Sequence, residues 1–372
     1  MYTRKTIAEI SLGALASNFS AIKSLLKPQT KFLASIKANA YGHGVVPLAQ
    51  ELVRLGVDAF GVSCVYEVIE LRKAGIKLPI LNMGPTFADE ASAVGEYDYI
   101  PTVFSLDIAQ KISAAANKKI KIHIKVDSGM NRIGAACEDV LQLVRDIQKL
   151  PNIEIDGLFT HFADADTPSS GVTEIQLQKF NNLLQELREA QIKIPLIHAA
   201  NSAGALFWPE SHFDMVRVGK SLYGYSPSDD ENLKLPVKLE PVMSIKSYIS
   251  HVKKVPADTP ISYGWTFRSK KESTIITLPI GYADGFRRAP QNFGEVLIGG
   301  EKCFVVGRVC MDQSMVDASP VQAPQVGDEV VIIGRQGDEK ITARDVAKQI
   351  GTSAYEVLSG VAPRVVRVYK DS

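Results

Sequence analysis

Short apolar runs alternate with amphipathic stretches between about residues 30 and 220, and this alternation constrains the fold more than any other feature of the sequence. The runs are rich in β-branched residues, and the intervening stretches are long enough for helices, a pattern typical of repeated βα units on a parallel sheet. Eight such units favour a TIM (β/α)8 barrel over an open doubly wound sheet, which usually has fewer strands. The candidate strands are residues 31–36, 58–63, 79–84, 99–104, 120–126, 153–160, 195–201 and 213–219.

The helical segment 172–191 shows how such units bury their apolar faces. Its large apolar residues recur at steps of three and four, which places them on one stripe of a helix. A stripe of this kind belongs to the core. The residues that we expect on it are Leu177, Phe180, Leu184 and Leu187.

A polar, proline-bounded stretch at residues 227–236 separates this region from one of different character. Beyond it, strand-like runs follow one another without long helices, and Gly299-Gly300 lies between two of them as a hairpin signal. The sequence therefore predicts a barrel over residues 12–230, and a β-rich domain made of residues 1–11 and 231–372.

Composition excludes several classes of function. The 372 residues carry a formal net charge of +1 and no basic run with interleaved aromatic residues, so we expect no nucleic-acid partner. No stretch approaches the length of a membrane span, and we expect a cytoplasmic protein. The four cysteines show no CxxC pairing and no histidine at metal-ligand spacing, so no metal is expected.

Polar side chains follow most of the predicted strands. Barrel enzymes carry their catalytic groups at the carboxyl ends of the strands, so each strand end supplies candidates. Those candidates are Lys37 after the first strand, Lys125, Asp127 and Arg132 at the fifth, His161 at the sixth, Asn201 and Ser202 at the seventh, and Arg217 and Gly219 at the eighth.

The loops after the seventh and eighth strands commonly bind a phosphate in this fold, through hydroxyl and backbone N–H donors. Asn201-Ser202 and Gly219-Lys220-Ser221 supply such donors here. A lysine at the end of one strand and a phosphate site across the barrel mouth together suggest pyridoxal 5'-phosphate, an aldehyde cofactor held as a Schiff base. On composition alone, Lys37 would more often be a solvated lysine.

The motifs around these residues resemble those of the alanine racemase family, in one order and over nearly the whole chain. The opening IAEISLGAL is similar to the N-terminal segment of that family. The other matching stretches are KANAYGHG (37–44), KVDSGMNRIG (125–134), THFADAD (160–166), HAANSAG (198–204), RVGKSLYG (217–224), ISYGWTF (261–267), IGYADG (280–285), GRVCMDQSMVD (307–317) and Tyr355.

The resemblance implies a PLP-dependent racemase that interconverts L- and D-alanine and so supplies D-alanine for peptidoglycan. Racemisation exchanges a proton on both faces of Cα, which two opposed bases can do. The resemblance makes Lys37 the Schiff-base lysine and one base, and Tyr263 the other base. It places Tyr263 in the active site of a partner subunit, which implies a homodimer with shared sites. Without the resemblance, Tyr263 is as well explained by packing at a strand edge.

Arg217 is the residue with the most specific chemical consequence. The resemblance places it against the pyridine nitrogen, where a guanidinium donates a hydrogen bond without handing over its proton. The alternative is an ion pair with a carboxylate such as Asp214. For His161, a core histidine is the alternative to the implied hydrogen-bond bridge between Arg217 and Tyr263.

The resemblance assigns further residues. Arg132 contacts the ring hydroxyl of the cofactor and the substrate carboxylate, and Lys125 is expected as a carbamylated lysine, which we treat as a hypothesis. Ser353 departs from the larger apolar residue expected at that position. The remaining expected contacts are Tyr41, Asn201, Ser202, Gly219, Lys220 and Tyr355 to the cofactor, Met311 and Asp312 to the substrate, and Asp166, Tyr282, Arg288 and Arg308 at the entrance.

Two other functions remain open on the residues. A basic amino-acid decarboxylase can share a PLP barrel with a β domain, but that chemistry usually needs an acidic partner at the pyridine nitrogen. A PLP carrier without turnover needs only the barrel and the lysine, and would have no use for Tyr263 and the Met311 region.

Overall fold

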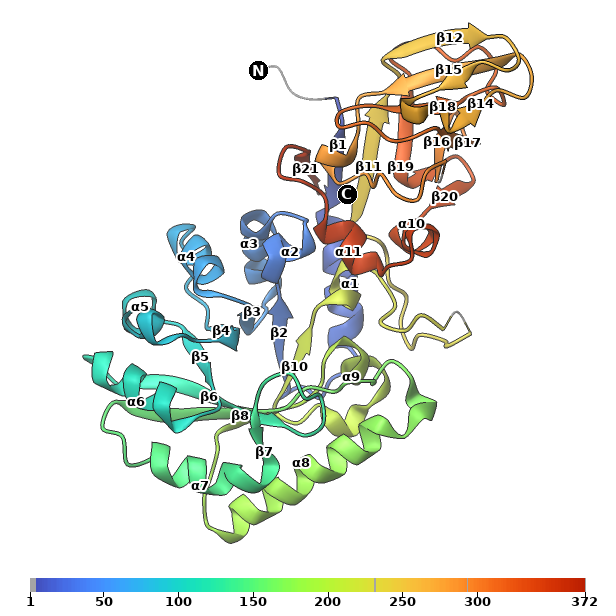
Figure 1. Cartoon of the computed structure of the whole chain (residues 1–372). Helices are drawn as coiled ribbons and strands as arrows, with labels where there is room; N and C mark the ends of the chain where they lie inside the picture. The colour runs from blue at the N-terminus through green and yellow to red at the C-terminus, as the bar shows by residue number, and fades with distance from the viewer. Residues whose placement is uncertain (1–4, 231, 293, 372) are drawn as a thin grey trace. The chain divides into compact units, whose positions relative to one another are not determined.

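The computed structural model describes residues 5–230, 232–292 and 294–371 (Figure 1). The chain divides into two compact units. The barrel unit consists of Leu15–Ala40 and Val45–Glu240, and the β unit consists of Met1–Ala14, Tyr41–Gly44 and Pro241–Ser372. The domain boundary predicted at residue 231 lies outside the described residues, as do the first four residues of the predicted segment 1–11.

Eight parallel strands form the barrel unit, one for each strand that the sequence predicts. Their order in the sheet is β10-β2-β3-β4-β5-β6-β8-β9, and the unpredicted two-residue β7 (Ala135–Ala136) pairs with β6. The strands are β2 (Lys31–Ser35), β3 (Ala59–Val62), β4 (Ile80–Pro85), β5 (Ile100–Val103), β6 (Ile120–Asp127), β8 (Ile153–Phe159), β9 (Leu196–His198) and β10 (Met215–Val218).

The barrel closes between β9 and β10 through single hydrogen bonds. The backbone N–H of Asp214 donates to the carbonyl of Ile197 at 2.9 Å, and that of Arg217 donates to the carbonyl of Ala200 at 3.0 Å. The Asp214 carboxylate also accepts from the backbone N–H of Ile197 at 2.7 Å. The eight strands therefore form a nearly closed barrel, and the predicted fold class is confirmed.

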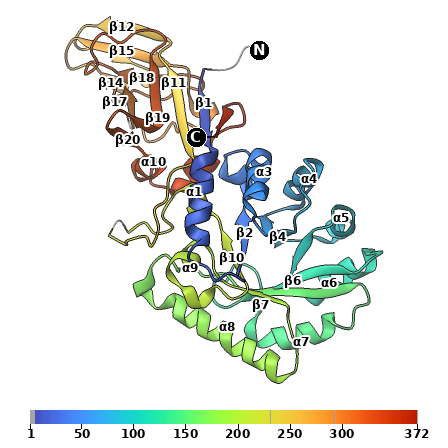
Figure 2. The same cartoon turned by 180° about the vertical axis from the view of Figure 1, so that it is seen from behind.

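Helices cover the outside of these strands (Figures 1 and 2). Consecutive helices from α3 to α8 pack against one another, as expected for sequential βα units. In α8 the buried stripe runs through Leu183, and the predicted Leu184 is only partly buried. The helices are α1 (Leu12–Lys23), α3 (Val45–Leu55), α4 (Val65–Lys73), α5 (Ala91–Tyr97), α6 (Leu106–Ala115), α7 (Cys137–Ile147), α8 (Val172–Glu189), α9 (Ser202–Phe207) and the 3-10 turns η1 (Ala88–Glu90), η2 (Pro168–Ser170), η3 (Pro209–Ser211) and η4 (Lys220–Tyr223).

The β unit is built on a mostly antiparallel sheet of order β12-β15-β18-β17-β16-β19-β11-β1-β21. The N-terminal strand β1 (Ile7–Ser11) joins it, antiparallel to β11 and parallel to β21. The other strands are β11 (Met243–Tyr248), β12 (His251–Val255), β15 (Ser273–Leu278), β16 (Glu295–Ile298), β17 (Glu301–Val306), β18 (Ser314–Asp317), β19 (Glu329–Gln336), β20 (Glu339–Ile341), β21 (Val366–Lys370) and the small pair β13 (Pro260–Ile261) and β14 (Phe267–Arg268).

The predicted hairpin is present in this sheet. Ile298 of β16 pairs with Glu301 of β17, and both Gly299 and Gly300 have positive φ, which a two-residue turn of this kind requires. Two short helices, α10 (Ala343–Ile350) and α11 (Ala354–Ser359), and the 3-10 turns η5 (Tyr263–Trp265) and η6 (Tyr282–Asp284) complete the unit. None of the helices among the described residues has both the length and the apolar character that a bilayer crossing requires.

Candidate active site

A left-handed turn follows the first strand of the barrel. The element α2 (Lys37–Tyr41) begins directly after β2, and Ala38, Asn39, Ala40 and Tyr41 have φ values of 51°, 54°, 52° and 52°. Left-handed helical backbone costs about 1–2 kcal/mol for each L-residue other than glycine. Four such residues in succession persist only where their surroundings determine the conformation.

Two side chains hold this turn within the barrel unit. Glu67 of α4 accepts hydrogen bonds from the backbone N–H of Ala38 at 2.6 Å and of Ser63 at 2.7 Å. The side-chain oxygen of Asn39 accepts from the backbone N–H of Val45 at 2.8 Å. Sequence reasoning missed Glu67, since no motif marks it and it reads as an ordinary acidic residue in the first turn of a helix.

Lys37 begins this turn and is partly buried. Burial lowers the pKa of Lys37, the nearby Arg132 charge lowers it further, and Glu67 opposes both effects. A lower pKa increases the fraction of neutral amine near neutral pH. The neutral amine is the form that attacks an aldehyde or accepts a proton.

Arg217 of β10 is 4% exposed and is surrounded by neutral acceptors. Its Nη1 donates to Nδ1 of His198 at 2.9 Å, and its Nη2 donates to the carbonyls of Thr160 at 2.8 Å and Ala199 at 2.9 Å. Nδ1 of His161 lies 3.3 Å from Nη2. These contacts fix the plane of the guanidinium group.

No described carboxylate forms an ion pair with Arg217. The alternative partner, Asp214, accepts from the backbone of Ile197 instead. Burial lowers the pKa of Arg217 to about 9, with the Arg132 charge as the second cause. Arg217 is therefore a buried guanidinium that remains protonated at neutral pH.

Lys125 and His161 lie in the same positive environment. Lys125 is 3% exposed, and its Nζ donates to the carbonyl of Val126 at 3.2 Å and lies 5.0 Å from the centre of the Phe159 ring. Burial and the Arg217 charge lower the pKa of both Lys125 and His161 well below their ordinary values. His161 is therefore neutral near pH 7, and the neutral form of Lys125 is favoured relative to an exposed lysine.

The loops after β9 and β10 contact each other through Ser202. Its Oγ accepts from the backbone N–H of Gly219 at 2.9 Å and of Ser221 at 3.5 Å. Oγ of Ser221 is buried and has no hydrogen-bond partner among the described residues. Asn201 caps α9 by accepting from the backbone N–H of Gly204 at 2.9 Å, and Nζ of the buried Lys220 donates to the carbonyl of Pro227 at 3.1 Å.

These donors and cations fit pyridoxal phosphate. The unpartnered Ser221 hydroxyl suits a phosphate, and the buried Arg217 suits a neutral ring nitrogen as acceptor. By contrast, no three His, Cys, Asp or Glu side chains within the described ranges form a group that could ligate a metal ion.

In the β unit, the predicted phosphate contacts Tyr41 and Tyr355 lie together. Their ring centres are 5.8 Å apart. Ser353, the residue that departs from the family pattern, caps α11 by accepting from the backbone N–H of Glu356 at 3.4 Å. Serine at this position therefore fixes the first turn of the helix that carries Tyr355.

The segments that carry Tyr263, Tyr282 and Met311 also meet in the β unit. The hydroxyl of Ser262 donates to the carbonyl of Arg308 at 2.5 Å. The backbone N–H of Tyr282 donates to the carbonyl of Cys310, and that of Ala283 to the carbonyl of Met311, both at 3.0 Å. Large side chains are exposed here: Tyr263 is 66%, Trp265 65%, Met311 54% and Tyr282 41% exposed.

The side chain of Asp312 is occupied within its own unit. Arg364 donates to it at 2.5 Å and to the buried Asp284 at 2.7 Å. The part of Asp312 left for a ligand is its backbone. Of the predicted entrance residues, the exposed Arg288 and the partly buried Arg308 belong to the β unit with Tyr282, and Nε of Arg308 donates to Gln291 at 3.2 Å. The partly exposed Asp166 belongs to the barrel unit.

Two family models match the chain. The model for the N-terminal domain of alanine racemase matches residues 10–227, and the model for its C-terminal domain matches residues 242–369. The chain belongs to the alanine racemase family. It is 44% identical to the alanine racemase of Methanococcus maripaludis over 366 residues, which cover 97% of this chain and 98% of that protein.

Solved structures of the alanine racemase family and of one further racemase are similar throughout. An alanine racemase of Clostridium difficile 630 has a TM-score of 0.95 and 42% identity, covering 100% of this chain and 97% of its own. A histidine racemase from Leuconostoc mesenteroides has a TM-score of 0.90 and 28% identity, covering 99% and 98%. The alanine racemase family uses pyridoxal phosphate.

Proposed function

We propose that this chain is a pyridoxal-phosphate-dependent racemase that interconverts L- and D-alanine, with Lys37 and Tyr263 as its two bases. The observation that carries this proposal is the buried, protonated Arg217, whose four contacts are all to neutral acceptors. A guanidinium at the pyridine nitrogen limits how far negative charge spreads into the ring. This favours simple return of a proton over other reactions of the same cofactor.

The residues proposed to hold the cofactor are Lys37 at its aldehyde carbon, Arg217 at its ring nitrogen, and Ser202, Gly219, Ser221, Tyr41 and Tyr355 at its phosphate. When bound, pyridoxal phosphate acts as an electron sink that makes the Cα proton of an amino acid removable. Arg132 and the backbone of the Met311–Asp312 turn are proposed to bind the substrate carboxylate. The exposure of Arg132 leaves its donors available for a ligand.

Each base acts on one face of Cα. Nζ of Lys37 takes or returns the proton on one face, and its lowered pKa makes the neutral amine available. The phenol oxygen of Tyr263 serves the other face. His161 is proposed to bridge Arg217 and this phenol as a neutral ring, because burial and then the Arg217 charge hold its pKa well below the usual range.

A homodimer with shared sites is the second part of the proposal. Tyr263, Trp265, Met311 and Tyr282 form an exposed, largely apolar surface over segments joined by backbone hydrogen bonds. Contiguous apolar surface of this kind marks a protein interface. If a second copy of the chain covers this surface, Tyr263 of each chain would enter the active site of the other chain. A cytoplasmic location also remains a prediction.

Alanine is the proposed substrate because Tyr355 and Tyr41 place two phenol rings close together, which favours a small side chain. Histidine is the specific alternative, because a protein of this fold at 28% identity is a histidine racemase. Chiral chromatography of the products from single L-amino acids, with pyridoxal phosphate present, tests the substrate. Formation of D-alanine supports the proposal. D-histidine without D-alanine, or release of carbon dioxide from basic amino acids, would overturn it.

Mixed dimers test the shared site. Lys37→Ala and Tyr263→Phe each inactivate all sites of their own homodimers. If Tyr263 acts in the partner's site, refolding equal amounts of both chains together creates one intact site in each mixed dimer. About a quarter of wild-type activity should then return, because half of the dimers are mixed and each has one intact site of two. If both bases come from one chain, no activity returns.

A further inference from the structure

A row of four polar side chains crosses the barrel interior behind Arg217. Nη1 of Arg217 on β10 lies 2.9 Å from Nδ1 of His198 on β9, whose Nε2 lies 3.0 Å from Nδ1 of His123 on β6. Nε2 of His123 lies 3.6 Å from Oδ2 of Asp156 on β8. The two histidines are 0% and 1% exposed, so water does not separate them. The contact with Asp156 is longer than a hydrogen bond, and Asp156 is the carboxylate that Nε2 of His123 faces, with no hydrogen-bond partner for that nitrogen among the described residues.

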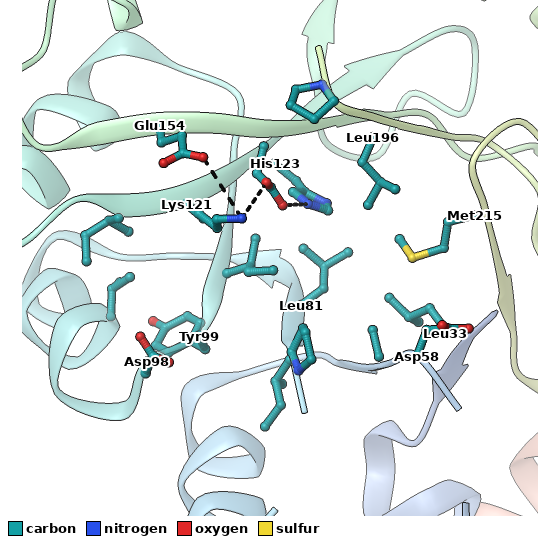
Figure 3. Close-up of a pocket in the computed structure, with 18 of the residues that line it drawn as sticks. Leu33, Asp58, Leu81, Asp98, Tyr99, Lys121, His123, Glu154, Leu196 and Met215 are labelled. Carbon is teal, nitrogen blue, oxygen red and sulfur yellow. Dashed lines mark hydrogen bonds and ion pairs between the residues drawn. The ribbon is translucent and has the colours of Figure 1, made fainter. Parts of the chain in front are cut away.

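The outer end of this row reaches a pocket of about 510 Å3 at the amino ends of the strands (Figure 3). Apolar residues such as Leu33, Leu81 and Met215 line it, and Lys121 lies at its wall beside His123. Nζ of Lys121 donates to Asp156 at 2.9 Å and lies 4.0 Å from Glu154. The predicted site residues of the barrel unit, such as Lys37 and His161, follow the opposite, carboxyl ends of the strands, and the row runs from Arg217 towards the amino ends.

Close packing restricts the positions of the His123 and His198 rings. Gly157, which pairs with His123 across the sheet, has no room for a Cβ, since an added Cβ would lie 2.6 Å from the imidazole of His123. The ring of Phe159 stacks on His198 at 4.7 Å with an interplanar angle of 3°. Both imidazoles are therefore held in fixed orientation.

The hydrogen bonds allow one arrangement of protons. A guanidinium has only donors, so Nδ1 of His198 must accept and its Nε2 must carry the proton. Nδ1 of His123 must then accept from His198, which leaves the proton of His123 on Nε2, facing the Asp156 carboxylate. Burial and the Arg217 charge lower the pKa of His198, and burial lowers the pKa of His123 although Asp156 opposes it, so both rings are neutral near pH 7.

We propose that Asp156 and His123 are positioning residues that act through His198 to keep the Arg217 side chain in one orientation. Asp156 selects the Nε2–H form of His123, and that form selects the Nε2–H form of His198. Arg217 at one end of the row and Asp156 at the other favour the same forms. Without the carboxylate only the Arg217 end favours them, and a proton on Nδ1 of His123 would then face the proton on Nε2 of His198. If His198 shifts its own proton to Nδ1 in response, it presents a donor to Arg217, and the guanidinium loses this contact.

The charged groups around the row are few. Lys121 and, beyond it, Glu154 face Asp156, whereas Lys125 and Arg217 lie nearest to His198. Glu154 is on the same strand as Asp156 and also contacts Lys121, but it has no contact with His123. It therefore provides a matched control for the loss of a carboxylate at this pocket.

Nitrogen-15 NMR of the imidazoles tests the proposal without relying on activity. The chain has only six histidines, so selective labelling gives a simple spectrum. In the chain without cofactor we expect His123 and His198 both as Nε2–H forms. Asp156→Ala should change the form of both rings. Asp156→Asn, which keeps an acceptor, should preserve them, and so should Glu154→Ala and Lys121→Met.

Kinetics provides the second measurement, and it rests on the proposed function. Asp156→Ala should lower kcat by about tenfold with little change in KM. At metal sites, removing the hydrogen-bond partner of a ligating histidine lowers activity by about 10- to 100-fold, and the expected loss is at the lower end of that range. Asp156→Asn should restore most of the loss, and Glu154→Ala should have no effect. Nδ1–H forms in the wild-type chain, or unchanged imidazole signals in both Asp156→Ala and His123→Gln, would overturn the proposal. Absence of racemase activity in the wild type would instead reject only the proposed function.

Discussion

The carboxylate of Glu67 accepts a hydrogen bond of 2.6 Å from the backbone N–H of Ala38, the residue directly after the candidate catalytic lysine. Glu67 also bonds to the backbone of Ser63. One acidic side chain on α4 thus joins the ends of two neighbouring strands and holds the start of the left-handed turn.

Replacing Glu67 by alanine should therefore impair both stability and the site. A hydrogen bond to a charged group contributes about 1.5–3 kcal/mol, and Glu67→Ala should lower the free energy of unfolding by an amount in this range. We expect a loss of kcat as well, because Lys37 loses its fixed position. Urea denaturation and alanine racemisation measure the two effects. Glu70→Ala, one turn further along α4, is the control, and it should change the free energy of unfolding by less than about 0.5 kcal/mol. Equal effects of the two variants would contradict the role of Glu67.

Gly281→Ala should disturb the turn that carries Met311. A Cβ at this position would lie 2.3 Å from the carbonyl oxygens of Cys310 and Met311, and backbone atoms cannot yield as side chains do. We expect a destabilisation of about 2 kcal/mol or more and a raised KM for alanine. Gly95→Ala in α5 is the control, because its Cβ would meet only Ile120 at 3.9 Å. That variant should be neutral or slightly stabilising, and a Gly281→Ala chain with unchanged stability would show that the turn adapts.

Lys125 should carry a carbamate. Burial lowers the pKa of its amine, and the neutral form of an amine is the one that adds carbon dioxide: the new N–C bond forms, one proton leaves, and the product is an anion. That anion would compensate the charges of Arg132 and Arg217. Carbon-13 NMR in labelled bicarbonate should show one bound carbamate signal that is absent from Lys125→Met. A native mass without the added carbon dioxide, and no carbon-13 signal, would show that Lys125 is unmodified.

Stability should fall as the pH is lowered from 7 to 5.5. Burial lowers the pKa of His123, His161 and His198 in the folded chain, while the unfolded chain titrates near 6.5. Below that pH the unfolded state binds more protons, so each such histidine removes up to about 1.4 kcal/mol per pH unit. Carboxylates with lowered pKa, such as Glu9, lose their contribution only at more acidic pH.

Denaturation curves at several pH values measure this slope. His198→Gln should reduce the slope by the share of one histidine, whatever its effect on stability at pH 7. His251→Gln, at an exposed strand position, should leave it unchanged. A free energy of unfolding that stays constant between pH 7 and 5.5 would show that these rings do not resist protonation.

The barrel could be predicted from sequence because its strands are buried on both faces and read as short apolar runs between helical stripes. All eight predicted strands are present within a few residues of their expected ends. Strand-end reasoning also selected Lys37, His161 and Arg217 as candidate site residues, since the carboxyl end of each strand is fixed once the strand is found. Steps of three and four from Phe180 and Leu187 fit both Leu183 and Leu184, so the spacing alone did not decide between them; in the structure Leu183 is buried and the predicted Leu184 is only partly buried.

Other features of the site had no sequence signal. Local propensity favours right-handed backbone for alanine and tyrosine, so the left-handed turn at residues 38–41 arises from tertiary contacts that sequence does not display. Glu67 acts on a backbone N–H 29 positions away, and His123 acts on Arg217 only through His198. Such relationships depend on which strands are neighbours, and that becomes known only with the fold.

The left-handed turn implies that, on heating, the candidate active site loses its structure before the barrel unfolds. Its conformation is unfavourable for the residues that form it, and contacts with α3 and α4 help to compensate that cost within the barrel unit. When those helices begin to fluctuate, the turn relaxes before the strands separate. The enzyme should then become inactive while most of its secondary structure is still intact, and cooling should restore it.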